Sequence, residues 1–112
     1  MDAIDMEKAQ RFIEDNLEKP LSLHDLSSKS GISKFHFTRS FKAFTGWTFK
    51  SYHNKMRVQA AKALLKDQNN RITDVCYAIG YNDLSYFDRM FRRHEGMTPS
   101  SYRKQCQIMD HN

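Results

Sequence analysis

Apolar residues recur at helical spacing along nearly the whole chain. In residues 5–17 they stand three or four positions apart, which places them on one face of a helix, and Pro20 ends the pattern. Six further segments have the same character, separated by short breaks: residues 23–31, 34–44, 48–66, 72–79, 83–94 and 98–106. The pattern predicts helices and almost nothing else, followed by a frayed tail at residues 107–112.

Two pairs of these segments are joined in the same way. In the first pair, Ser33 can cap the second helix, and a glycine after each helix can supply the left-handed residue that ends it. Two short helices joined by a tight turn that contains glycine form a helix-turn-helix, predicted here at residues 23–44. A second such unit is predicted at residues 72–94, with Asn82 or Asp83 as the corresponding cap.

The second unit repeats the residues of the first as well as its pattern. The recurring pairs are Leu23/Ile72, Asp25/Asp74, Leu26/Val75 and Gly31/Gly80 at an offset of 49, and Phe37/Phe87, Arg39/Arg89, Phe41/Phe91, Gly46/Gly96, Thr48/Thr98, Ser51/Ser101 and Tyr52/Tyr102 at an offset of 50. Two copies are too few for a solenoid, which needs about three or more repeats. They suit a protein that holds a periodic partner at two points, and double-stranded DNA is such a partner.

Charge supports this interpretation. The 112 residues are enough for one domain or for two small lobes, and they carry a net charge of +5 with a pI near 9.3. The first eighteen residues hold six acidic and two basic side chains, so the remainder has 16 basic against 7 acidic side chains, a net charge of +9. The positive charge is concentrated where the repeats are, which favours a polyanionic partner.

The predicted second helix of each unit divides into a core face and an outward face. Phe37 with Phe41, and Phe87 with Phe91, are four residues apart and are expected to pack in the core. The outward faces give the candidate DNA contacts: Lys34, Phe35, His36, Thr38, Arg39 and Lys42 in the first unit, and Leu84, Ser85, Asp88, Arg89, Arg92 and Arg93 in the second.

Different roles are expected within this set. Arg39 and Arg89 occupy equivalent positions and can each donate two hydrogen bonds to guanine, whereas Lys42, Arg92 and Arg93 are expected to contact phosphates. For Arg39 and Arg89, the alternative to a base contact is a phosphate contact or a side chain that is simply solvated.

The longest helical pattern, residues 48–66, lies between the two units. Its expected apolar stripe consists of Phe49, Tyr52, Met56, Ala60, Ala63 and Leu64. Nineteen residues of helix span about 28 Å, and major-groove faces on one side of B-DNA recur about every 34 Å. A helix of this length is expected to hold two reading helices about one turn of DNA apart.

The chain from Ile72 to Arg103 resembles the C-terminal signature of the AraC/XylS family of bacterial transcription regulators. The matching residues are Ile72, Asp74, Val75, Gly80, Tyr81, Ser85, Phe87, Arg89, Phe91, Gly96, Thr98, Pro99, Tyr102 and Arg103. Upstream, Arg57, Ala61, Leu64 and Leu65 resemble the linker helix of the family, and residues 23–46 its first helix-turn-helix.

The resemblance implies an all-α fold of seven helices over residues 5–106: two helix-turn-helix lobes, homeodomain-like, joined by one long helix. It also implies that the third and sixth helices enter adjacent major-groove segments. Two departures from the family pattern stand out, since Cys76 replaces a common Ala and Asp88 brings an acid to the reading face. A carboxylate there could accept a hydrogen bond from cytosine N4 or repel phosphate, so the two lobes are expected to grip DNA unequally.

Other classes of protein are disfavoured. The five histidines show no HExxH or similar spacing, and the two cysteines form no CxxC motif, so we expect neither an enzyme nor a cofactor or metal site. No segment is apolar enough to span a membrane and no signal peptide is recognisable, which indicates a cytoplasmic, nucleoid-associated protein.

The expected function is sequence-specific binding of promoter DNA as a monomer, with activation of transcription through RNA polymerase. A non-specific architectural DNA-binding protein is the alternative. Most members of the family carry a separate sensing domain. The chain is therefore either a stand-alone regulator, as in the MarA/SoxS-like subgroup and slightly favoured here, or the DNA-binding part of a longer one.

Overall fold

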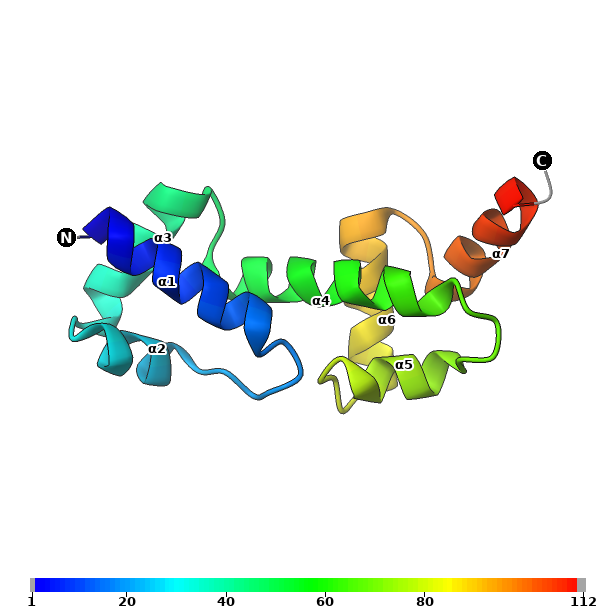
Figure 1. The fold of residues 1–112 in the computed structure, drawn as a ribbon, viewed down its shortest axis with the longest axis horizontal. Helices are drawn as coiled ribbons and strands as arrows, with labels where there is room; N and C mark the ends of the chain where they lie inside the picture. The colour runs from blue at the N-terminus through cyan, green and yellow to red at the C-terminus, as the bar shows by residue number, and fades with distance from the viewer. Residues whose placement is uncertain (1, 111–112) are drawn as a thin grey trace. The chain divides into compact units, whose positions relative to one another are not determined.

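The computed structural model describes residues 2–110, and side chains from Met6 to Met109. This part of the chain forms helices and no strands (Figure 1). The seven helices are α1 (Asp2–Asp15), α2 (Leu23–Ser30), α3 (Lys34–Thr45), α4 (Phe49–Leu65), α5 (Ile72–Ala78), α6 (Leu84–Glu95) and α7 (Pro99–Asp110). The all-α, seven-helix fold is therefore confirmed.

The helices form two compact units, with the division between Asn54 and Lys55. The first unit contains α1, α2, α3 and the first turns of α4. The second contains the rest of α4 with α5, α6 and α7. Helix α4 therefore supplies residues to both units.

The core of the first unit forms as its helical periodicity predicts. Its fully or almost fully buried residues are Met6, Ala9 and Ile13 of α1, Leu26 of α2, Phe37 and Phe41 of α3, and Tyr52 of α4. The Tyr52 hydroxyl donates a hydrogen bond to Glu14 and accepts one from Gln10 Nε2 at 3.0 Å. Burial and the Glu14 contact raise the pKa of Tyr52 to about 12, so the phenol remains protonated and links α4 to α1.

The second unit has a larger aromatic and aliphatic core. It consists of Val58, Ala61 and Leu65 from α4, Val75, Cys76 and Ile79 from α5 and its end, Tyr81 from the turn, and Phe87, Met90 and Phe91 from α6. Cys76 is fully buried, so this small side chain forms part of the core. All four phenylalanines of the repeat are also fully buried, which confirms their predicted core role.

The predicted apolar stripe of α4 is wrong in its second half. Ala63 and Leu64 are exposed, and the buried positions there are Val58, Ala61 and Leu65. The physical reason is that α4 packs in two cores, so no single stripe runs along its whole length. Arg57, which is not part of the predicted stripe, is only 8% exposed and lies with its guanidinium carbon 4.9 Å from the centre of the Tyr81 ring.

The helix ends follow local chemistry. The Ser33 Oγ accepts a hydrogen bond from the backbone N–H of His36 at 3.1 Å, and Asp83, one of the two expected caps, accepts one from Tyr86 at 3.2 Å. Gly46 ends α3 with φ of 83°, a left-handed conformation that a side chain would strain. Helix α7 was expected to end at Cys106 and instead continues to Asp110, so most of the predicted tail is helical; residues 111–112 lie outside the described part.

Candidate nucleic-acid interface

Helix α3 presents a continuous exposed face. Its inner side is held by Phe37 and Phe41, whose rings stack at 5.6 Å between centroids and are fully buried. This packing fixes the rotation of the helix about its axis. All six residues predicted for DNA contact in this unit are exposed: Lys34, Phe35, His36, Thr38, Arg39 and Lys42.

An exposed aromatic ring supports the central arginine of this face. The guanidinium carbon of Arg39 lies 5.3 Å from the centre of the Phe35 ring, which is itself 70% exposed. A cation–π contact of this kind restricts the arginine without consuming its hydrogen-bond donors. The Thr38 hydroxyl donates to the Lys34 carbonyl at 2.8 Å, so its oxygen can still accept a hydrogen bond.

Helix α6 presents the equivalent face of the second unit. Phe87, Met90 and Phe91 are buried on its inner side. Of the predicted contacts, Leu84, Ser85, Arg89, Arg92 and Arg93 are exposed, whereas Asp88 is only partly exposed.

The position of Asp88 sets this face apart from α3. Its negative charge acts on the buried thiol of Cys76, where burial first, and then Asp83 and Asp88, raise the thiol pKa. The carboxylate therefore influences the α5 side of the unit as well as the reading face.

Arg89 also has an aromatic support, which the sequence-based selection of site residues omitted. Its guanidinium carbon lies 5.6 Å from the centre of the Tyr86 ring, and Tyr86 meets the edge of the buried Tyr81 ring at 5.7 Å. The signal was an aromatic residue three or four positions before an arginine on the same helix, a spacing that places both on one face. Each unit therefore holds its central arginine against a ring.

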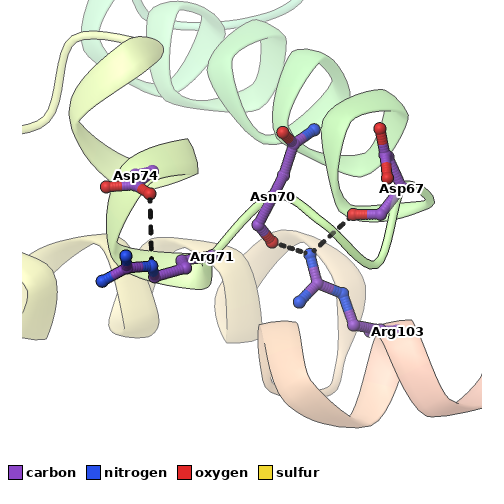
Figure 2. Close-up of polar contacts among 5 residues, drawn as sticks. All are labelled: Asp67, Asn70, Arg71, Asp74 and Arg103. Carbon is purple, nitrogen blue, oxygen red and sulfur yellow. Dashed lines mark hydrogen bonds and ion pairs between the residues drawn. The ribbon is translucent and has the colours of Figure 1, made fainter.

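Arg103 fixes the loop that leads into the second helix-turn-helix. Figure 2 shows it reaching from α7 to this loop, where its Nη2 donates to the backbone carbonyls of Asp67 (3.2 Å) and Asn70. Its Nε also donates to the Leu65 carbonyl at 2.9 Å, at the end of α4. Beyond the loop, the exposed Arg71 and Asp74 form a loose ion pair at 3.9 Å. The sequence identified Arg103 only as a signature residue, and its role depends on backbone more than thirty residues away.

Metal-binding clusters and membrane-spanning helices are absent from the described residues. No group of three or more His, Cys, Asp or Glu side chains within them is placed to hold a metal ion. No helix in this part of the chain is long and apolar enough to cross a bilayer.

Comparison with known sequences identifies a family. A family model described as a helix-turn-helix domain matches residues 26–105. The multiple antibiotic resistance protein MarA of Escherichia coli is 34% identical over 102 residues, which cover 91% of this chain and 80% of MarA. The regulatory protein PocR of Salmonella typhimurium is 32% identical over 106 residues, and the HTH-type transcriptional activator Btr of Bacillus subtilis is 34% identical over 99. The matches cover 95% and 88% of this chain but only 35% of PocR and 19% of Btr.

Solved structures give the same result. A transcriptional regulator from Chromobacterium violaceum, described as an AraC-type DNA-binding domain-containing protein, superposes with a TM-score of 0.83 at 28% identity, over 92% of each chain. The chain thus belongs to the AraC/XylS family of transcription regulators and contains the DNA-binding helix-turn-helix domain of that family.

Proposed function

We propose that residues 5–106 form a sequence-specific DNA-binding domain in which α3 and α6 each read one major-groove segment of a bipartite promoter site. One observation carries the proposal. In both units, a buried phenylalanine pair turns the same helix face outward, and that face holds an arginine at the same repeat position against an aromatic ring, Phe35 in α3 and Tyr86, from a neighbouring repeat position, in α6. A surface used only for attraction to phosphate would not need this repeated placement.

The exposed side chains divide the work of recognition. Arg39 and Arg89 each donate two hydrogen bonds to a guanine, and each such pair is worth about 1–3 kcal/mol of discrimination between bases. The ring beneath each guanidinium reduces the number of conformations that binding must select. Lys42, Arg92 and Arg93 contact phosphates and supply affinity that depends on salt rather than on sequence.

The chain acts as a monomer, because two non-identical reading faces on one chain match a non-palindromic site. It does so in the cytoplasm, on the DNA of the nucleoid. It activates transcription by contacting RNA polymerase once bound. The activator description of Btr, with which it shares 34% identity over 99 residues, supports this sign of regulation.

Selection of duplexes from a random library at physiological salt tests the proposal. The expected result is a motif with two boxes about one helical turn apart, bound at least about 10³-fold more tightly than scrambled DNA. Tight, salt-sensitive binding without enrichment of any sequence would instead establish an architectural protein.

Three single substitutions test the assignment of roles. Arg39→Ala and Arg89→Ala should each relax base preference in one box, with a loss of about 1–3 kcal/mol on the selected duplex. Lys42→Ala should weaken binding to every duplex alike and reduce the salt dependence. Equal losses on all sequences for all three variants would refute the roles given to the arginines.

A further inference from the structure

The first unit contains a cavity away from the reading face of α3. It lies between α1 and α2 and has a volume of about 300 Å³. Its lining consists of Lys8, Ala9 and Phe12 from α1, and Leu26, Lys29 and Ser30 from α2. Ala9 and Leu26 belong to the buried core and Phe12 is half-buried, so the floor of the cavity is apolar.

Two cationic side chains from different helices line this cavity. Lys8 and Lys29 are exposed, and the Lys29 ammonium lies 5.0 Å from the centre of the Phe12 ring. The Ser30 hydroxyl donates to the Leu26 carbonyl at 2.9 Å, so its oxygen can accept but has no proton left to donate to a ligand. The charged groups available to a ligand at the mouth of the cavity are therefore positive.

The second unit has an equivalent cavity with different chemistry. The buried residues Met6, Ala9 and Ile13 of α1 correspond to Val58, Ala61 and Leu65 of α4, at a constant offset of 52 positions. The equivalent cavity, between α4 and α5, has a volume of about 130 Å³ and is lined by Leu64, Asn70, Asp74, Val75 and Ala78.

The equivalence of the two cavities shows which residues the fold itself requires. Lys8 corresponds to Ala60 at the offset of 52, and Lys29 corresponds to Ala78 at the offset of 49 that relates α2 to α5. The packing of an opening helix against the first helix of a helix-turn-helix therefore requires neither lysine. The fold also forms with the smaller cavity of the second unit.

We infer that the α1/α2 cavity binds a small organic carboxylate with an aryl or alkyl tail. The tail covers the apolar floor formed by Phe12, Leu26 and Ala9, and the carboxylate pairs with the ammonium groups of Lys8 and Lys29. The volume of about 300 Å³ is at the lower end of the range for small-molecule sites, which suits a ligand of this size. None of the residues that line the site belongs to α3 or α6, the helices proposed to read DNA.

Titration of the isotope-labelled full chain with 4-phenylbutyrate, followed by amide NMR without DNA, tests the inference. Phenylbutyrate should shift the amides of Ala9 and Leu26 saturably and leave those of Val75 and Ala78 in place. The matched compounds 4-phenylbutanol and 4-phenylbutylamine have the same tail with a neutral or a positive head group. Each should bind at least about fivefold more weakly, since exposed ion pairs contribute modestly.

Variants locate the charge effect. Lys8→Gln combined with Lys29→Gln should reduce the affinity for phenylbutyrate to that for phenylbutanol and leave phenylbutanol binding unchanged. Lys34→Gln, on the exposed face of α3, is the control and should not alter phenylbutyrate binding. Equal affinity for the three compounds, equal shifts at Val75 and Ala78, or no saturable shift would each overturn the inference. Since no DNA is present, none of these results bears on promoter recognition.

Discussion

The two units achieve the same helical arrangement with different side chains. Their opening helices bury residues at the same spacing, Met6, Ala9 and Ile13 in one and Val58, Ala61 and Leu65 in the other, although only the alanine is shared. The phenylalanine pairs of α3 and α6, by contrast, are identical. Spacing and size are thus enough where a helix only packs, whereas the helix that presents the reading face keeps the phenylalanine pair that orients it.

The units differ more in how their loops are held. In the first, the His53 Nε2 lies 3.4 Å from the Leu17 carbonyl, just beyond the end of α1. In the second, the residue fifty positions later is Arg103, which donates to three carbonyls at the end of α4 and in the loop that follows. The same repeat position thus contacts the loop in both units, through an imidazole in the first and through a guanidinium that holds three carbonyls in the second.

The reading faces differ in charge. The exposed face of α3 has basic residues and no acid, whereas α6 carries Asp88 where α3 has Thr38. We therefore predict that the two units share their core energetics but not their affinity for DNA.

The largest expected effect tests the equivalence of the two cores. Phe41→Ala and Phe91→Ala each remove a fully buried ring and should each reduce the stability of their own unit by about 3–5 kcal/mol. Urea titrations followed by the methyl NMR signals of the buried Met6 and Met90 report the two units separately. A large loss for one variant and a small loss for the other would show that the repeated phenylalanines are not energetically equivalent.

The loop contacts of Arg103 and His53 should contribute unequally to the stability of the two units. Arg103→Ala removes three charge-assisted hydrogen bonds and should destabilise the second unit by about 2–3 kcal/mol, whereas His53→Ala should cost the first unit about 1 kcal/mol or less. The same urea titrations measure both. Arg103→Lys, which keeps the charge but not the fork, should recover only part of the loss, and the exposed Lys104→Ala should change little. Equal losses for Arg103→Ala and His53→Ala would contradict the difference between the units.

An exchange at one repeat position tests the difference in charge. Asp88→Thr should tighten binding of the selected duplex by about 1 kcal/mol, because a carboxylate near phosphates is repelled, and Thr38→Asp should weaken it by a similar amount. Fluorescence anisotropy with the bipartite duplex at two salt concentrations provides the measurement. If Asp88→Thr instead weakens binding only where one cytosine is present, Asp88 reads that base.

The smallest expected effect is a pH dependence of the stability of the second unit, caused by His94. Burial, followed by the nearby charges of Arg93 and Lys55, lowers the pKa of His94 below its usual value of 6.5, while Glu95 acts in the opposite direction. The folded unit thus favours neutral His94, and the stability this provides above pH 6.5 is lost as the pH falls through the lowered pKa.

When the pH is lowered from 7.5 to 5.5, the free energy of unfolding of the second unit, followed at Met90, should fall by less than about 1 kcal/mol relative to that of the first unit, followed at Met6. The first unit has Phe44 at the position of His94 and provides the internal reference. His94→Gln should abolish the difference, and a difference that persists in this variant would exclude His94 as its source.

The sequence by itself determined the helices, their caps and the repeat. These features follow from short-range chemistry, because apolar residues three or four positions apart select a helix. The side chain of Ser33 caps the start of α3, and Gly46, which has no side chain, ends it in a left-handed conformation. It also separated the buried phenylalanines from the exposed candidate contacts, because residues four apart share a helix face. The DNA roles of those contacts remain predictions.

Only the tertiary structure decided features that depend on which segments come together. The buried face of α4 changes along its length because two cores compete for one helix, which no single periodicity can express. The clamp of Arg103 and the cavity between α1 and α2 likewise arise from residues brought together by packing. Local pattern specifies which face of a helix is apolar, but the neighbour that covers this face is selected by the fold.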